Sequence, residues 1–115
     1  MITTMDWTLT IVFIASGLLM IGLAIPMIRG NVTPNHWYGF RVKRTVEDPQ
    51  IWYPANTYAG KLMVVYGVVL VLAAIVLPFV LPDLAADTLA WIMVAILLGG
   101  LPIVVLLSWR YLRTL

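Results

Sequence analysis

The sequence predicts an all-α membrane protein with three transmembrane helices and an ordered cytoplasmic loop between the first and the second. Two observations support this fold class. Of the 115 residues, 63% are hydrophobic and only 10% are charged, whereas soluble domains carry about 25% charged residues. Charge is also absent from three long stretches, at residues 7–28, 62–81 and 89–109. A chain this short cannot cover so much apolar surface with polar groups, so residues 1–115 are expected to form a single membrane domain.

The first uncharged stretch is long enough to cross a bilayer. A helix over residues 7–28 is roughly 33 Å long at ~1.5 Å per residue, and the hydrocarbon core is ~30 Å thick. A cleavable signal peptide would need a basic start and a shorter apolar core. No Lys or Arg precedes this stretch, and it ends in Pro26-Met-Ile-Arg29. We therefore expect a retained helix.

The second and third stretches meet at a short polar connection. Pro78 and Pro82 mark the end of the second span. Asp87 or Thr88 is expected to cap the third helix by accepting hydrogen bonds from its free N–H groups. Pro102 removes one backbone hydrogen bond within the third helix, which predicts a kink there.

The basic residues predict the orientation in the membrane. With three spans, all of them fall on one side, and Asp6, Asp83 and Asp87 fall on the other. Basic segments stay in the cytoplasm, so the N-terminus is expected outside, and the loop at residues 29–61 and the C-terminus inside, in the inner (cytoplasmic) membrane of a bacterium. The lipid bilayer is then the first expected partner. The basic residues are Arg29, Arg41, Lys43, Arg44, Lys61, Arg110 and Arg113.

Small residues predict where the helices pack, because lipid gives them no hydrophobic reason to associate. Gly60, Gly67 and Ala74 recur at heptad spacing along the second span, which indicates a left-handed crossing near ~20°. The third span offers Gly99 and Gly100 near its midpoint. The first span offers Ala15, Ser16, Gly17 and Gly22.

The loop at residues 29–61 contains most of the polar and aromatic side chains. Asn35 and Gly39 are residues that shape turns, one by bonding nearby backbone and the other by permitting positive φ. Thr45 or Asp48 is expected to cap a short helix whose first residue is Pro49. Trp52, Asn56 and Gly60 follow at helical spacing and reach the small-residue face of the second span. We expect an amphipathic segment on the membrane surface that bends into this span.

Two polar side chains in the loop have both a structural and a binding interpretation. In the structural interpretation Arg41 pairs with Glu47, Asp48 or a backbone carbonyl, and in the binding interpretation it binds an anionic group of a lipid, peptide or partner. The structural interpretation is favoured for Arg41. It is also favoured for Asn56, whose amide is expected to fix the loop and not to bind a ligand. His36 is the only His and Cys is absent, so no metal site is expected. Nucleic-acid binding would need a larger basic face.

The loop also carries a motif. Pro34-Asn35-His36-Trp37-Tyr38-Gly39-Phe40-Arg41, followed by Thr45, Trp52, Ala55-Asn56 and Ala59-Gly60, resembles the signature of the SdpI family. Its members are small bacterial membrane proteins related to an immunity protein against a secreted killing peptide. Val42-Lys43 departs from the Thr-Pro that many members have after the Arg. The resemblance implies that the motif residues fix the loop or bind a partner: Asn35, Tyr38, Gly39, Arg41, Thr45, Trp52, Asn56 and Gly60.

The sequence favours binding over catalysis. It has no Ser/His/Asp or Cys/His set and no paired carboxylates expected in one site, and the uncharged spans lack the ionisable groups that pumps keep there. Neither enzymatic activity nor a cofactor is expected. One hypothesis is an accessory or structural subunit of a larger bacterial membrane assembly, respiratory or photosynthetic, with other subunits or further copies as partners. The other, from the resemblance, is an immunity or signalling protein against a membrane-active peptide.

Overall fold

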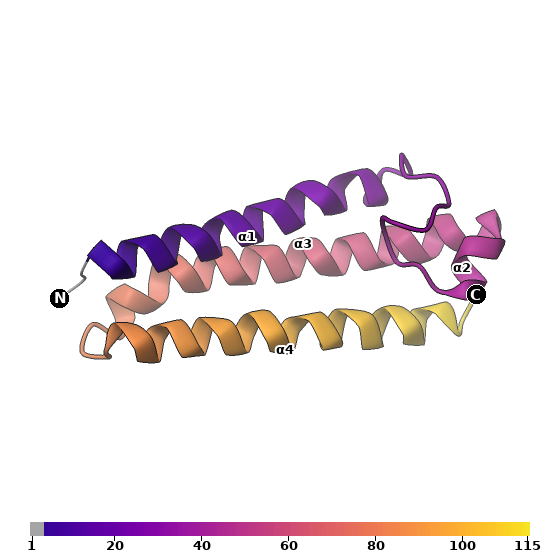
Figure 1. Cartoon of the computed structure of the whole chain (residues 1–115). Helices are drawn as coiled ribbons and strands as arrows, with labels where there is room; N and C mark the ends of the chain where they lie inside the picture. The colour runs from indigo at the N-terminus through magenta and orange to yellow at the C-terminus, as the bar shows by residue number, and fades with distance from the viewer. Residues whose placement is uncertain (1–3) are drawn as a thin grey trace.

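The computed structural model describes residues 4–115, and helices are the only regular elements in that part of the chain. The three long helices run side by side, and α3 packs against both α1 and α4 (Figure 1). All three are long and apolar enough to cross a membrane, which confirms the expected fold class. The helices are α1 (Thr4–Ile28), α2 (Lys43–Glu47), α3 (Pro49–Val80) and α4 (Ala86–Leu112).

Helix α3 begins at Pro49, well before the predicted start of the second span at residue 62. The Asp48 side chain accepts a hydrogen bond from the backbone N–H of Gln50 at 2.9 Å and so caps the helix, with Pro49 in its first turn. Residues 49–61 are therefore part of one continuous helix, and not a loop segment that bends into the span. The expected cap at Asp48 and first residue at Pro49 are confirmed. What differs is that the segment runs on without a break, because the edge of an apolar run marks where lipid begins and not where a helix begins.

The early start makes α3 longer than a bilayer requires. Its 32 residues correspond to about 48 Å at ~1.5 Å per residue. The last turn of α1 lies level with Gly60, because a Cβ there would come within 2.9 Å of the Ile28 side chain. On the other side, the Tyr58 ring stacks on Tyr111 of α4, with centroids 4.2 Å apart. Residues 49–57 therefore project beyond the level at which α1 and α4 end.

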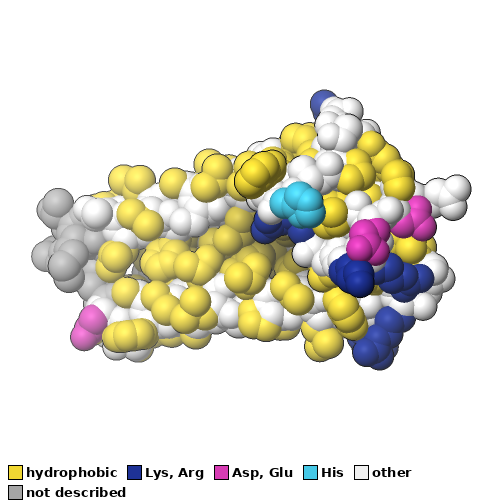
Figure 2. All heavy atoms as spheres, turned by 45° about the vertical axis from the view of Figure 1, so that its right-hand side comes forward, with side chains coloured by type: hydrophobic (Ala, Val, Ile, Leu, Met, Phe, Trp, Pro, Cys, Tyr) yellow, Lys and Arg dark blue, Asp and Glu magenta, His cyan; other side chains and the backbone are white. Residues whose placement is uncertain are grey.

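Charge gathers at this end of the bundle. Figure 2 shows Lys, Arg and His side chains concentrated there, while hydrophobic side chains cover the remaining length. We call this the basic end, made of residues 29–60 and the last turn of α4. The asymmetry agrees with the charge pattern of the sequence. Which side of the membrane the basic end faces stays a prediction.

Glycines bring α1 and α3 close together. A Cβ on Gly67 would lie 2.6 Å from the carbonyl oxygen of Gly17, and one on Gly17 would lie 2.7 Å from that of Gly67. Nearer the basic end, a Cβ on Gly60 would lie 3.0 Å from the Ala24 oxygen. Ala74, further along the same stripe, is 3% exposed within the core cluster of Phe13, Leu70 and Met93.

Two expectations for α4 need correction. A Cβ on Gly100 would meet the Tyr66 ring at 2.3 Å, but one on Gly99 would have no neighbour within 4 Å, so only Gly100 lies at a helix contact. The N-cap is Ala85, and Asp87 lies inside the first turn, where its carboxylate accepts from the N–H of Thr88 at 3.0 Å. An acidic side chain in a first turn also favours the helix dipole. The helix continues through Pro102.

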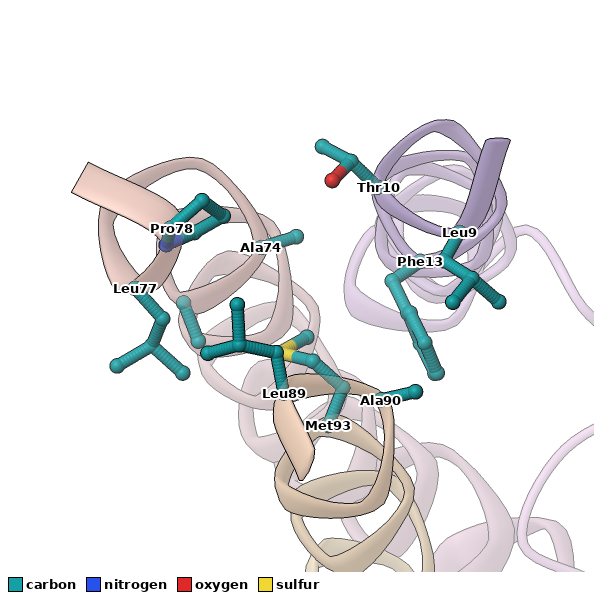
Figure 3. A pocket seen from close by; sticks show the side chains of 10 residues that line it. Leu9, Thr10, Phe13, Ala74, Leu77, Pro78, Leu89, Ala90 and Met93 are labelled. Carbon is teal, nitrogen blue, oxygen red and sulfur yellow. The ribbon is translucent and has the colours of Figure 1, made fainter. Parts of the chain in front are cut away.

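The end opposite the basic end holds a small apolar cavity between all three long helices (Figure 3). Its volume is about 30 Å³, enough for about two waters at ~10–15 Å³ each. Leu9 and Phe13 of α1, Leu77 of α3 and Met93 of α4 are among the side chains that line it. Ligand sites have volumes of roughly 300–1,000 Å³, so this cavity is a packing defect and no candidate site.

Candidate functional site: the loop cap at the basic end

The motif residues build a compact structure around the projecting turns of α3. We call residues 31–56 the loop cap: it comprises the loop at residues 31–48 and the first turns of α3 at residues 49–56. Apart from the short helix α2, residues 31–48 lack regular secondary structure, so their backbone groups need other hydrogen-bond partners. Side chains of Asn35, Thr45, Trp52 and Asn56 supply many of them.

Asn35 holds the first turn of the cap. Its Oδ1 accepts hydrogen bonds from the backbone N–H groups of Trp37 at 2.8 Å and Tyr38 at 2.7 Å. Its Nδ2 donates to the carbonyl of Thr33 at 2.8 Å. An Asn side chain that bonds the backbone two and three residues ahead replaces a regular turn. The Tyr38 hydroxyl then donates to the carbonyl of Leu23 and ties this turn to α1.

Asn56 and Gly39 fit each other closely. Asn56 is 1% exposed, its Oδ1 accepts from the Phe40 N–H at 2.6 Å, and its Nδ2 donates to the Trp52 carbonyl at 2.9 Å. Gly39 has φ +105°, a conformation that L side chains rarely adopt. A Cβ on Gly39 would also lie 2.4 Å from Asn56 Oδ1. Backbone conformation and space therefore both require glycine at this position.

Thr45 and Trp52 are buried and bonded to the loop. Thr45 is 0% exposed, and its Oγ1 accepts from the Val42 N–H at 2.9 Å. The Thr45 hydroxyl proton has two carbonyl acceptors within 2.9 Å, those of Phe40 and Val42. Trp52 is also 0% exposed, and its Nε1 donates to the Val32 carbonyl at 2.7 Å. Each side chain thus fixes a different part of the loop on the start of α3.

Arg41 pins the turn and remains on the surface. Its Nε donates to the Gly39 carbonyl at 3.3 Å, and one terminal nitrogen donates to the His36 carbonyl. These backbone bonds match one of the structural partners expected from the sequence. The side chain is exposed, and a guanidinium has five N–H donors, so donors remain for an anionic group.

Arg44 fastens the cap to α4, a contact that the sequence did not reveal. Its guanidinium donates to the Leu112 carbonyl at 2.7 Å and also to the Leu115 carbonyl. A cation at a helix C-terminus satisfies free carbonyls and favours the dipole. The stacking of Tyr58 on Tyr111 adds a second link to α4. Both links join residues far apart in the sequence, and no local pattern points to them.

Gly60, the last motif residue, lies outside the cap at the contact of α3 with α1. The motif therefore combines two roles, because most of its residues fix the loop and Gly60 sets how closely α1 approaches. Within the part of the chain that the structure describes, no group of three or more His, Asp or Glu side chains is arranged to hold a metal ion. The cap offers a shaped, hydrogen-bonded surface.

One face of this surface covers a cavity. The turn at residues 37–40 lies over a space of about 290 Å³ between α1, α3 and α4. Its walls are largely apolar, and Ser108 of α4 is among the lining residues although its Oγ is buried and has no hydrogen-bond partner. Trp37, on the same turn, is 84% exposed. The cap thus presents a large aromatic side chain beside an apolar opening.

The comparisons with known proteins agree with the motif. A family model described as the SdpI/YfhL protein family matches residues 31–108. The match begins at the loop cap and extends through all of α3 and most of α4. Searches of curated proteins and of solved structures give no match.

Proposed function

Because this chain belongs to the SdpI/YfhL family, we propose that it is a non-catalytic membrane protein that protects a bacterial cell against a membrane-active peptide, as an immunity or signalling protein. In this proposal it lies in the inner membrane with its basic end toward the cytoplasm. It binds the peptide, or reports its presence, through the loop cap. No step of this activity needs a cofactor or a reacting side chain.

The observation that supports this proposal is the exposed Trp37 on a pinned turn. Asn35 and Tyr38 hold the turn from both sides through backbone hydrogen bonds. Trp37 itself is 84% exposed. Trp prefers the membrane–water interface, where membrane-active peptides also bind, and Trp and Arg are enriched among the residues that dominate binding energy. A rigid turn presents Trp37 and Arg41 without a large ordering cost.

The test is survival of cells that lack the gene. A deletion strain is challenged with a panel of membrane-active peptides from neighbouring bacteria, and the same strain carrying the gene on a plasmid is the control. We expect the deletion strain to survive only lower concentrations of at least one peptide than the parent strain does. The plasmid copy of the gene is expected to restore survival at the parent's concentration. Unchanged survival across the whole panel would count against peptide protection.

A second candidate function is an accessory or structural subunit of a larger membrane assembly, respiratory or photosynthetic. The observation that favours it is the exposed surface of α4, since only 11% of its most apolar stretch is buried inside the bundle, against 22% for α1 and for α3. Such a surface suits lipid or neighbouring helices equally. Purification in mild detergent through a C-terminal tag, followed by mass spectrometry, tests it. A fixed set of partner chains supports the subunit role, and recovery of this chain alone at several detergent strengths contradicts it.

A further inference from the structure

Another hollow at the basic end lies between α2 and the end of α4. Its volume is about 410 Å³, within the roughly 300–1,000 Å³ of ligand pockets. The end of α4 lies beside α2 (Figure 1), and the Arg44 guanidinium joins the two by donating to the Leu112 carbonyl at 2.7 Å. We call this hollow the α2–α4 groove, lined by Lys43, Arg44 and Glu47 of α2 and by Trp109, Leu112 and Arg113 at the end of α4.

The groove has a surplus of positive charge. Lys43, Arg44 and Arg113 are exposed cations on its walls, and Glu47 is the one carboxylate among its lining residues. Arg44 is engaged with the carbonyls at the end of α4. Among the residues that the structure describes, neither the Lys43 ammonium nor the Arg113 guanidinium has a hydrogen-bond or ion-pair partner. Two cations without partners on one groove favour an anionic ligand.

The groove also has an apolar wall at the end of the third span. Trp109 is the last residue of the uncharged stretch 89–109, and its side chain is 40% exposed. Trp prefers the membrane–water interface. The buried Leu112 lines the same groove. Cations and an interfacial aromatic side chain therefore meet where α4 is expected to leave the bilayer, at the depth of the lipid headgroups.

We propose that the α2–α4 groove binds the phosphate of an anionic membrane lipid. Lys43 and Arg113 pair with the phosphate oxygens, and Trp109 contacts the adjoining part of the lipid. Arg44 holds α2 against α4, so the groove exists before the lipid binds. A lipid fits better than a soluble phosphate compound because cations and an apolar wall occur together at the end of a membrane-spanning helix, where basic pockets bind lipid headgroups.

This site is separate from the one through which peptide protection is proposed. Neither Trp37 nor Arg41 lines the α2–α4 groove. Lipid binding is therefore measurable on the purified protein whether or not the cell depends on it for resistance.

The test is lipid binding to purified, delipidated protein in mild detergent, measured by native mass spectrometry. Dioleoyl phosphatidylglycerol is the anionic probe, dioleoyl phosphatidylcholine has the same chains on a zwitterionic headgroup, and inorganic phosphate is the soluble competitor. We expect one phosphatidylglycerol per chain, bound more tightly than phosphatidylcholine and retained in a large excess of phosphate. Equal binding of the two lipids overturns the proposal. Displacement by inorganic phosphate also overturns it, because the groove then binds a soluble anion.

Two matched pairs of variants distinguish a site from the general positive charge of this end. Lys43→Gln and Arg113→Gln each remove one cation from the groove and are expected to weaken phosphatidylglycerol binding about fivefold. Lys61→Gln and Arg110→Gln remove the same charges from exposed positions that do not line the groove, and are expected to leave binding unchanged. All four are surface substitutions, which seldom change stability. Equal losses in the four variants would mean that the lipid responds only to net charge, and would overturn the site.

Glu47→Gln provides a test of opposite sign. Removing the carboxylate from the groove removes its repulsion of the phosphate, so phosphatidylglycerol should bind about two- to fivefold more tightly. A Glu47→Gln variant that binds this lipid no more tightly than the unmodified protein would show that the phosphate does not lie in the α2–α4 groove.

Discussion

Replacing Gly39 with Ala tests whether the loop cap is one hydrogen-bonded unit. The backbone of Gly39 has φ +105°, and left-handed conformations cost an L residue roughly 1–2 kcal/mol. The added Cβ would lie 2.4 Å from Asn56 Oδ1, so Asn56 must move and release the Phe40 N–H. Leaving buried groups without a partner costs about 1–3 kcal/mol. Together, Gly39→Ala is expected to destabilise the protein by about 2–5 kcal/mol.

Gly30 provides the matched control. It also has positive φ, at +70°, but its added Cβ would meet only the Tyr53 ring, at an ordinary 3.9 Å. Gly30→Ala therefore carries the backbone strain without the clash and should cost about 1–2 kcal/mol. The assay is the free energy of unfolding from sodium dodecyl sulfate titration in mixed micelles. The free energies of unfolding of Gly39→Ala and Gly30→Ala are expected to differ by the cost of displacing the Asn56 side-chain amide.

A double-mutant cycle makes this reasoning refutable. In an Asn56→Ala background the obstacle to a Cβ on Gly39 is gone, so Gly39→Ala should then cost only the strain of about 1–2 kcal/mol. If Gly39→Ala cost the same in both backgrounds, or no more than Gly30→Ala, the close fit of Gly39 and Asn56 would contribute nothing to stability.

Three further predictions concern packing, topology and the link to α4. Gly67→Val forces α1 and α3 apart, because a Cβ at Gly67 would lie 2.6 Å from a backbone oxygen. This variant should have a lower thermal stability in detergent. The control Gly22→Val should not, because a Cβ at Gly22 would meet nothing within 4 Å. For topology, a membrane-impermeant thiol reagent added to whole cells should label Leu84→Cys and not Lys43→Cys, and the reverse pattern would contradict the predicted orientation. Arg44→Gln removes donors to two carbonyls at the end of α4 and should speed hydrogen exchange in the last turn of that helix. The matched Lys43→Gln should leave this exchange rate unchanged, and equal rates in both variants would show that the Arg44 bonds do not hold the helix end.

Hydropathy predicted the three spans because every residue of a span contributes to that signal. The motif likewise indicated that Asn35 and Gly39 shape a turn, since both effects are local to the backbone. The start of α3 was likewise predicted from local signals, a capping side chain at Asp48 and a proline in the first turn at Pro49. The unbroken continuation of this helix into the span was not predicted, because hydropathy marks only the apolar run that begins at residue 62.

Contacts between helices depend on how each helix is rotated, and the sequence does not show this. Gly99 and Gly100 are neighbours with the same chemistry, yet only Gly100 meets Tyr66. The bond of Arg44 to Leu112 joins the loop cap to the end of α4, two segments that meet only after the bundle has formed. The unpaired hydroxyl of Ser108 is equally invisible, because most helical serines bond their own backbone.

The measurement that tests the proposed function most directly is survival of the deletion strain carrying single variants, at equal abundance in the membrane. Trp37→Ala removes the exposed aromatic from the cap, and Trp91→Ala removes one of similar exposure from α4, at 84% and 72% respectively. Peptide protection through the cap predicts that the Trp37→Ala variant loses resistance to the peptide that kills the deletion strain, while the Trp91→Ala variant keeps it. Full resistance in cells with the Trp37→Ala variant would contradict a role for the cap in protection.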